Sequence, residues 1–177
     1  NLQVVRVQHE RANGDDVVIH EETGEIAGLA LQGPTSCAIL KKAGFAGVEL
    51  LKPFVIGNFS LGDIAVTISR TGFTGDLGYE LFVDAADALA LWDALMEAGA
   101  LLGITPIGYA ALDHARLEAG FIVANHDFVT VDSALRIDRT RFPDEIGLDW
   151  LVDLKKDHFN GRRAIKEARE NGRLRRC

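Results

Sequence analysis

The feature that most constrains this chain is a glycine-rich turn that runs directly into an alternating strand. Residues 69–81 read SRTGFTGDLGYEL, which places three glycines and two threonines ahead of Glu80. The alternation puts Glu80 and Phe82 on one face of the predicted strand, opposite to Tyr79. A carboxylate beside an aromatic ring costs free energy when it has no partner, so Glu80 needs a hydrogen-bond donor. A neighbouring arginine would satisfy it, and so would a heterocycle that offers two N–H groups.

Apolar periodicity predicts strands and helices in alternation along most of the chain. Strands are expected over residues 4–7, 16–20, 26–32, 54–59, 64–69, 79–83 and 146–152, and helices over residues 36–43, 84–99, 108–119 and 161–170. In the helix over residues 84–99, the spacing of Leu89, Trp92, Leu95 and Met96 predicts a stripe that faces the core. This order predicts an α+β fold, with mainly antiparallel sheets and helices packed on one face.

Composition and charge exclude several classes of protein. The chain has 177 residues, of which 47% are hydrophobic and 25% charged, as in ordinary globular proteins. A formal net charge of -7 argues against nucleic acid as the main partner. There is no apolar run of about 18 residues, so we expect no membrane span. The two cysteines, Cys37 and Cys177, have no metal-ligand spacing, and they fit a reducing, cytoplasmic location.

Two further groups of polar residues are candidates for chemistry, and each has a simpler interpretation. Arg116 follows Asp113 by three residues in the helix over residues 108–119. Its guanidinium could bind a ligand carboxylate, or it could pair with Asp113 on the helix surface. The run Asn125-His126-Asp127 places an imidazole beside a carboxylate, as in proton transfer, but turn formation is the first expectation. The five histidines show no ligand spacing, so no metal site is predicted.

Five segments, in order, resemble the folate-binding part of the glycine cleavage T-protein family, which contains the aminomethyltransferases and related folate-dependent demethylases. These segments are residues 29–34, 69–81, 116–120, 147–150 and 159–161. The resemblance implies a tetrahydrofolate-dependent one-carbon transferase of the aminomethyltransferase type. It also implies that the one-carbon donor is a small molecule or a lipoyl carrier protein.

The resemblance assigns roles to three residues. It implies that Glu80 grips the pterin ring, that Arg116 lies near the folate, and that Phe73 replaces a ring-contacting tyrosine. Phe73 lacks the hydroxyl group but keeps an aromatic face for stacking. A carboxylate, an aromatic ring and a cation suit a flat pterin with a polyanionic tail. The catalytic residue stays unknown, because the family's catalytic aspartate would precede Asn1.

The resemblance also divides the chain into three parts. Residues 1–25 would end a first folate-binding subdomain, and residues 26–105 would form a ferredoxin-like α+β middle subdomain. Residues 106–177 would return to complete the first subdomain and begin a C-terminal domain that is missing. We therefore expect the chain to be a fragment of a longer protein.

Other functions remain as alternatives. A folate-dependent demethylase of another methyl donor is favoured by His126, which departs from the Gly-Asn-Asp-like segment usual in glycine-cleavage enzymes. A non-catalytic folate-binding or interaction module is the second alternative. The iron–sulfur-assembly branch is disfavoured, because His158 stands where that branch carries a cysteine.

Overall fold

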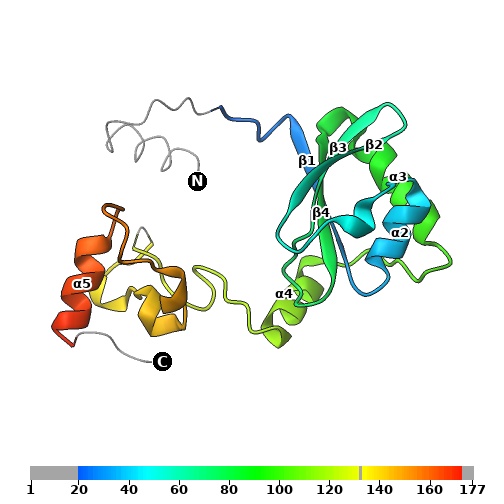
Figure 1. Cartoon of the computed structure of the whole chain (residues 1–177). Coiled ribbons are helices and arrows are strands. Elements are labelled where there is room, and N and C mark those ends of the chain that lie inside the picture. The colour runs from blue at the N-terminus through cyan, green and yellow to red at the C-terminus, as the bar shows by residue number, and fades with distance from the viewer. Residues whose placement is uncertain (1–19, 132, 173–177) are drawn as a thin grey trace. The chain divides into compact units, whose positions relative to one another are not determined.

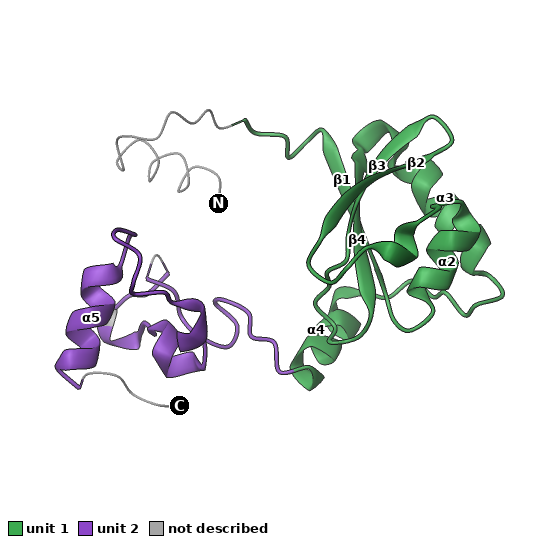
Figure 2. Cartoon of the chain, viewed as in Figure 1, with its two compact units in different colours: residues 1–119 green, residues 120–177 purple. Residues whose placement is uncertain are grey.

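The computed structural model describes residues 20–131 and 133–172, and the chain divides into two compact units (Figure 2). Unit 1 comprises residues 1–119 and unit 2 comprises residues 120–177. The strand expected over residues 4–7, and all but the last residue of the one over 16–20, lie outside the described residues.

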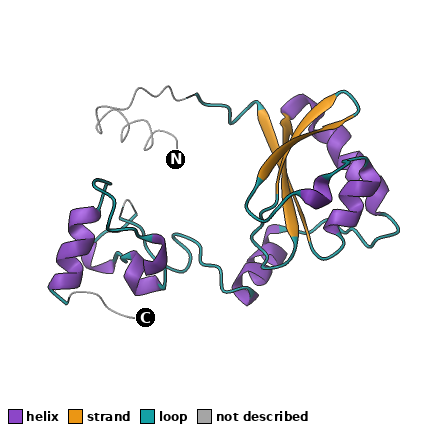
Figure 3. Ribbon diagram, viewed as in Figure 1, coloured by secondary structure: helices purple, strands orange, loops and turns teal. Residues whose placement is uncertain are grey.

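Unit 1 is built on a four-stranded sheet. Its elements are β1 (Ile26–Gln32), α2 (Ser36–Ala43), a 3-10 turn (Val48–Leu50), β2 (Ile56–Leu61), β3 (Ile64–Ser69), β4 (Gly78–Asp84), a 3-10 turn (Ala85–Asp87), α3 (Ala88–Gly99) and α4 (Tyr109–Glu118) (Figure 1). The strand order is β1-β4-β3-β2, and all neighbouring strands are antiparallel. A ferredoxin-like sheet would place β1 beside β3, whereas here β4 lies between them. Helices α2 and α3 pack on one face, which confirms the predicted α+β class (Figure 3).

The alternation predicted for β4 decides which face of the sheet is the core. Tyr79, Leu81 and Val83 are buried on the side of the sheet that the helices cover. Leu40 of α2 and Leu91 of α3 are buried in the same cluster. Fully burying one such side chain contributes about 1.5–3 kcal/mol, so this cluster orients the whole sheet. Glu80 must then lie on the opposite face.

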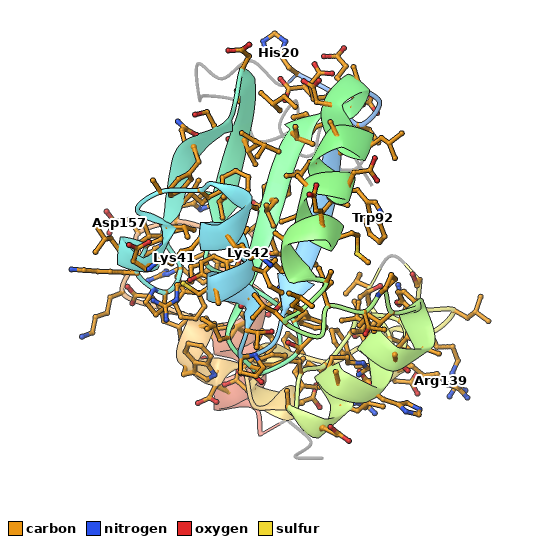
Figure 4. The ribbon with its side chains drawn as sticks, turned by 90° about the vertical axis from the view of Figure 1, so that its right-hand side faces the viewer. His20, Lys41, Lys42, Trp92, Arg139 and Asp157 are labelled. Carbon is orange, nitrogen blue, oxygen red and sulfur yellow. The ribbon has the colours of Figure 1, made fainter. Side chains whose placement is uncertain are left out.

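The stripe expected on the helix over residues 84–99 is only partly correct. Leu95 is buried as predicted, but Leu89 is 70% exposed, and Trp92, which projects from the side of the helix (Figure 4), is 40% exposed. The residues that face the core are Leu91, Leu95 and Ala98, which follow the i, i+4, i+7 spacing. Apolar residues occur on more than one side of α3, so the sequence spacing alone did not decide which of two overlapping stripes faces the core.

The described part of unit 2 contains α5 (Arg162–Glu170) and three 3-10 turns (Ile137–Arg139, Pro143–Ile146 and Asp149–Leu151). Helix α5 confirms the helix expected over residues 161–170. The buried strand expected over residues 146–152 is wrong, because Gly147 adopts a left-handed φ of 75° and ends the preceding turn. The Leu148 N–H then donates to the Pro143 carbonyl, and Trp150 is 75% exposed. The apolar run is therefore a pair of turns.

Candidate functional site

The connection between β3 and β4 is the glycine-rich turn, residues 70–77. Its end is tied to the end of β1, because the Gly33 N–H donates to the Leu77 carbonyl at 2.7 Å. Gly75 has a φ of 78°, and a Cβ placed on it would lie 2.5 Å from the Cβ of Ala119. Only glycine fits so close an approach in this conformation. The turn therefore passes directly against the C-terminal end of α4.

Glu80 lies on β4 between two strands, opposite Ala30 of β1 and Ser69 of β3, and is half-buried. The hydroxyl of Thr71 donates to Oε2 of Glu80. Oγ of Ser69 lies 2.7 Å from Oγ1 of Thr71, and it must be the donor because the Thr71 proton is already used. Among the described residues, Oε1 of Glu80 has no hydrogen-bond partner. One carboxylate oxygen is thus held and the other is available to a ligand.

An arginine does not supply the partner of Glu80. The nearest arginine in sequence, Arg70, donates from Nη1 to the Leu51 carbonyl at 2.9 Å. No ion pair of Glu80 occurs within residues 20–131 and 133–172. The structure therefore does not contain an ion pair between Glu80 and a neighbouring arginine, which was one of the two expectations for the partner of Glu80.

Arg116 of α4 makes the ion pair that was one of its two expectations. Its Nε and Nη2 atoms both lie 2.7 Å from Oδ1 of Asp113. Arg116 is only 3% exposed, however, so the pair is not a simple surface contact. A buried guanidinium needs its charge compensated, and Asp113 provides one part of this compensation.

The three predicted site residues belong to one part of unit 1. Phe73 is carried by the glycine-rich turn and is 41% exposed, and Glu80 follows the same turn. Arg116 precedes Ala119 by three residues, and Ala119 is where the turn meets α4. The fold thus places an aromatic ring and a carboxylate on the turn, close to the end of the helix that carries the arginine.

A cavity of about 500 Å³ lies beside the turn within unit 1. Gln32 and Thr74 contribute polar groups to its wall, while Trp92 and Met96 of α3 and Leu112 of α4 contribute apolar ones. None of the three predicted site residues lines this cavity. It adjoins the candidate site through the glycine-rich turn.

Two residues of the candidate site were not singled out from the sequence. Thr71 donates to Glu80, and Gln32 contacts the glycine-rich turn at several points. Gln32 belongs to the segment over residues 29–34 that carries part of the family resemblance. The family resemblance therefore drew attention to the segment that contains Gln32, but the sequence pattern assigned no role to Gln32 itself.

Tyr79 precedes Glu80 but serves the core. Burial, aided by a hydrogen bond with Cys37, raises the pKa of Tyr79 to about 12. The phenol therefore stays neutral across the physiological range. Its proximity in sequence to Glu80 does not make it part of the site, because it points to the other face of the sheet.

The run Asn125-His126-Asp127 in unit 2 forms a turn, as first expected. Oδ2 of Asp127 accepts from the Val123 N–H at 2.7 Å, and Asn125 has a left-handed φ of 64°. Oδ1 of Asn125 accepts from the N–H and the hydroxyl of Thr130. The side chains of Asn125 and Asp127 are thus used to hold the backbone, and His126 is exposed.

In the part of the chain that the structure describes, no group of three or more His, Cys, Asp and Glu residues is arranged to hold a metal ion. Each helix in the same part is too short or too polar to cross a membrane.

Comparison with known proteins gives one consistent result. Residues 2–156 match the family model described as the GCVT N-terminal domain. The chain is 41% identical over 151 residues to an aminomethyltransferase of Halothermothrix orenii, covering 85% of this chain and 40% of that protein. It is 39% identical over 170 residues to an aminomethyltransferase of Streptomyces avermitilis, covering 95% of this chain and 43% of that protein.

A solved structure is similar as well. The crystal structure of glycine cleavage system aminomethyltransferase T from Bartonella henselae matches with a TM-score of 0.73 and 30% identity. The match covers 96% of this chain and 43% of that one. The chain therefore spans about two-fifths of the length of the relatives it matches.

Proposed function

The chain belongs to the family of the GCVT N-terminal domain, and on this premise we propose that it forms the folate-binding part of an aminomethyltransferase. The membership confirms the resemblance to the glycine cleavage T-protein family that the sequence motifs indicated. The complete protein would transfer a one-carbon unit to tetrahydrofolate.

The observation that carries this proposal is the carboxylate of Glu80. Its Oε2 atom is oriented by Thr71, while Oε1 has no hydrogen-bond partner among the described residues. A pterin ring presents two N–H groups along one edge, and a carboxylate can accept from both. Charge-assisted hydrogen bonds of this kind are stronger than neutral ones and fix the ring's orientation.

Phe73 and Arg116 would complete the pocket. The half-exposed ring of Phe73 offers an apolar face on which a pterin could stack. Arg116 places a guanidinium at the end of α4, with part of its charge balanced by Asp113. We propose that Arg116 contributes positive potential to the polyanionic folate rather than acting as a solvent-exposed anchor.

The donor and the partner are part of the same proposal. Several relatives are named aminomethyltransferases, which favours an aminomethyl group delivered by a lipoyl carrier protein. A folate-dependent demethylase is the second candidate, favoured by His126 in a segment where glycine-cleavage enzymes differ. We further propose a cytoplasmic protein that does not bind nucleic acid, in keeping with its formal net charge of -7. Supplying an aminomethylated carrier protein or a small methyl donor to the complete protein would separate the two activities.

The domain boundaries are also proposals. Residues 26–105 would form the middle subdomain, and residues 1–25 and 106–177 would belong to the subdomain that flanks it. The remaining three-fifths of a typical relative would supply the other walls of the folate site and the catalytic acid.

The first test is the affinity of the full-length protein for tetrahydrofolate, measured by calorimetric titration. Replacing Glu80 by alanine should weaken binding by more than ~1.5 kcal/mol, about tenfold or more, because a charged hydrogen-bond partner is lost. Glu97→Ala is the matched control, since Glu97 is an exposed glutamate on α3. Wild-type affinity in the Glu80 variant would refute the proposed contact.

A further inference from the structure

We propose that Gln32 is a positioning residue of this site: its side-chain amide fixes the path of the glycine-rich turn and so holds Thr71 and Glu80 in place. The inference rests on the proposed function of Glu80. It concerns a residue at the end of β1 that is not one of the three residues assigned to the ligand.

The amide of Gln32 is used at three points along the turn. Nε2 donates to the carbonyl of Thr71 at 3.3 Å and to the carbonyl of Tyr79 at 3.2 Å. Oε1 accepts from the hydroxyl of Thr74 at 3.3 Å. The first carbonyl lies where the turn begins, the second where β4 begins, and the hydroxyl between them. One side chain thus spans the whole connection.

Two glycines, one in the turn and one at the start of β4, leave room for this amide. A Cβ on Gly72 or on Gly78 would collide with the amide atoms of Gln32. Neither glycine has a left-handed φ, so backbone conformation does not require glycine at these positions. The position of the Gln32 amide favours glycine instead, because a Cβ at either position would force the amide to move away from its hydrogen-bond partners. The absence of side chains at Gly72 and Gly78 therefore leaves the space that the Gln32 amide fills.

The consequence for Glu80 follows through one residue. Gln32 holds the backbone of Thr71, and the hydroxyl of Thr71 donates to Oε2 of Glu80. The backbone of Gln32 is itself held in the sheet, because Gln32 lies opposite Gly78 in the register of β1 and β4. Loss of the amide would free the turn and leave the carboxylate without a fixed donor.

The first experiment measures the tetrahydrofolate affinity of the full-length protein in a double-mutant cycle. Gln32→Met keeps the volume but removes the three hydrogen bonds of the amide. It should weaken binding about fivefold, the loss expected when the Thr71 hydroxyl no longer donates to Glu80. In the Glu80→Ala background the same change should weaken binding by less than about twofold, because Gln32 acts through Glu80. An equal loss in both backgrounds, or no loss in either, would overturn the inference.

A second readout does not depend on folate. Hydrogen exchange of the folate-free protein should quicken at least about tenfold over residues 70–79 in Gln32→Met, and stay unchanged over the β2–β3 hairpin. Gly78→Ala should lower the unfolding temperature in the wild type, and much less in Gln32→Ala, where the collision is absent. Additive effects of these two changes, or unchanged exchange over the turn, would overturn the inference.

These outcomes separate the two proposals. If Glu80→Ala binds folate as the wild type does, the folate contact fails, while quickened exchange over residues 70–79 still supports Gln32 as the residue that orders the turn. If Gln32→Met does not fold, Gln32→Glu replaces it, since a glutamate keeps the length but cannot donate to the carbonyls of Thr71 and Tyr79.

Discussion

At the scale of the residue, the carboxylate of Glu80 is oriented by hydroxyl groups and not by a cation. Ser69 donates to Thr71, and Thr71 donates to Glu80. A guanidinium in this place would have neutralised the carboxylate and occupied its Oε1 atom, which has no hydrogen-bond partner among the described residues. Hydroxyl donors hold the group in one orientation and leave its negative charge for a ligand's N–H groups.

Thr71→Val tests this arrangement, because valine keeps the shape of threonine and removes the donor. We expect tetrahydrofolate to bind about fivefold more weakly, the value for losing one hydrogen bond of about 1 kcal/mol. Calorimetric titration measures the affinity. Thr67→Val is the matched control, since the Thr67 hydroxyl, on the same face of the sheet, donates to Oδ1 of Asn58 at 3.1 Å. A loss of affinity as large in the control would contradict the role of Thr71.

The sequence was sufficient to predict the face that Glu80 occupies but not its donor. Alternation along β4 follows from the geometry of a strand, and the burial of Tyr79 and Leu81 leaves Glu80 on the other side. The donor lies nine residues earlier, and the path that brings it back depends on Gln32, thirty-nine residues from Thr71. No local pattern encodes a contact of that range.

At the scale of the element, local signals predicted most strands and failed where the choice between two helix faces or a turn decided the outcome. The strands β1 and β3 begin and end where the pattern placed them, and Gly44 ends α2 in the left-handed conformation, as glycine commonly does. The stripe of α3 was ambiguous, because apolar residues lie on more than one side of the helix and contacts with the sheet decide which side is buried. The run over residues 146–152 is apolar enough for a strand, but a single left-handed glycine, Gly147, breaks it.

Tyr79 on β4 should make the stability of the folded protein depend on pH in a measurable way. The pKa of Tyr79 is raised from 10.0 to about 12, first by burial and then by its hydrogen bond with Cys37. The neutral phenol is favoured in the folded state, so its contribution is complete below pH 10 and is lost as the pH rises toward 12. The free energy of unfolding, from denaturant titrations at several pH values, should fall over this interval.

Tyr79→Phe isolates the effect, because phenylalanine fills the same core position without a titrating group. The variant should lose the part of the pH dependence between pH 10 and pH 12 that the raised pKa of Tyr79 causes. If the free energy of unfolding depended on pH identically in wild type and variant, the pKa of Tyr79 would be the same in the folded and unfolded states, which would contradict this prediction.

At the scale of the whole molecule, the two units differ in what holds them together. The large buried cluster, with Phe45, Ile68 and Leu91 among its members, lies entirely in unit 1. In the described part of unit 2, Ile165 and Ala168 are the buried apolar residues. Polar contacts contribute much of the rest, including the ion pair of Asp144 with Arg169 at 2.6 Å.

This difference predicts separate behaviour when the units are expressed apart. Residues 20–119 should unfold cooperatively on heating, because burial of a continuous apolar cluster makes unfolding all-or-none. Residues 120–177 should show no cooperative transition, since a chain below about 70 residues needs a well-filled core or a covalent or metal staple to fold alone. Far-UV circular dichroism and calorimetry would follow both pieces. A sharp transition in residues 120–177 would mean that its polar contacts suffice. Its absence would mean that the segment carrying α5 depends on other parts of the protein for its fold.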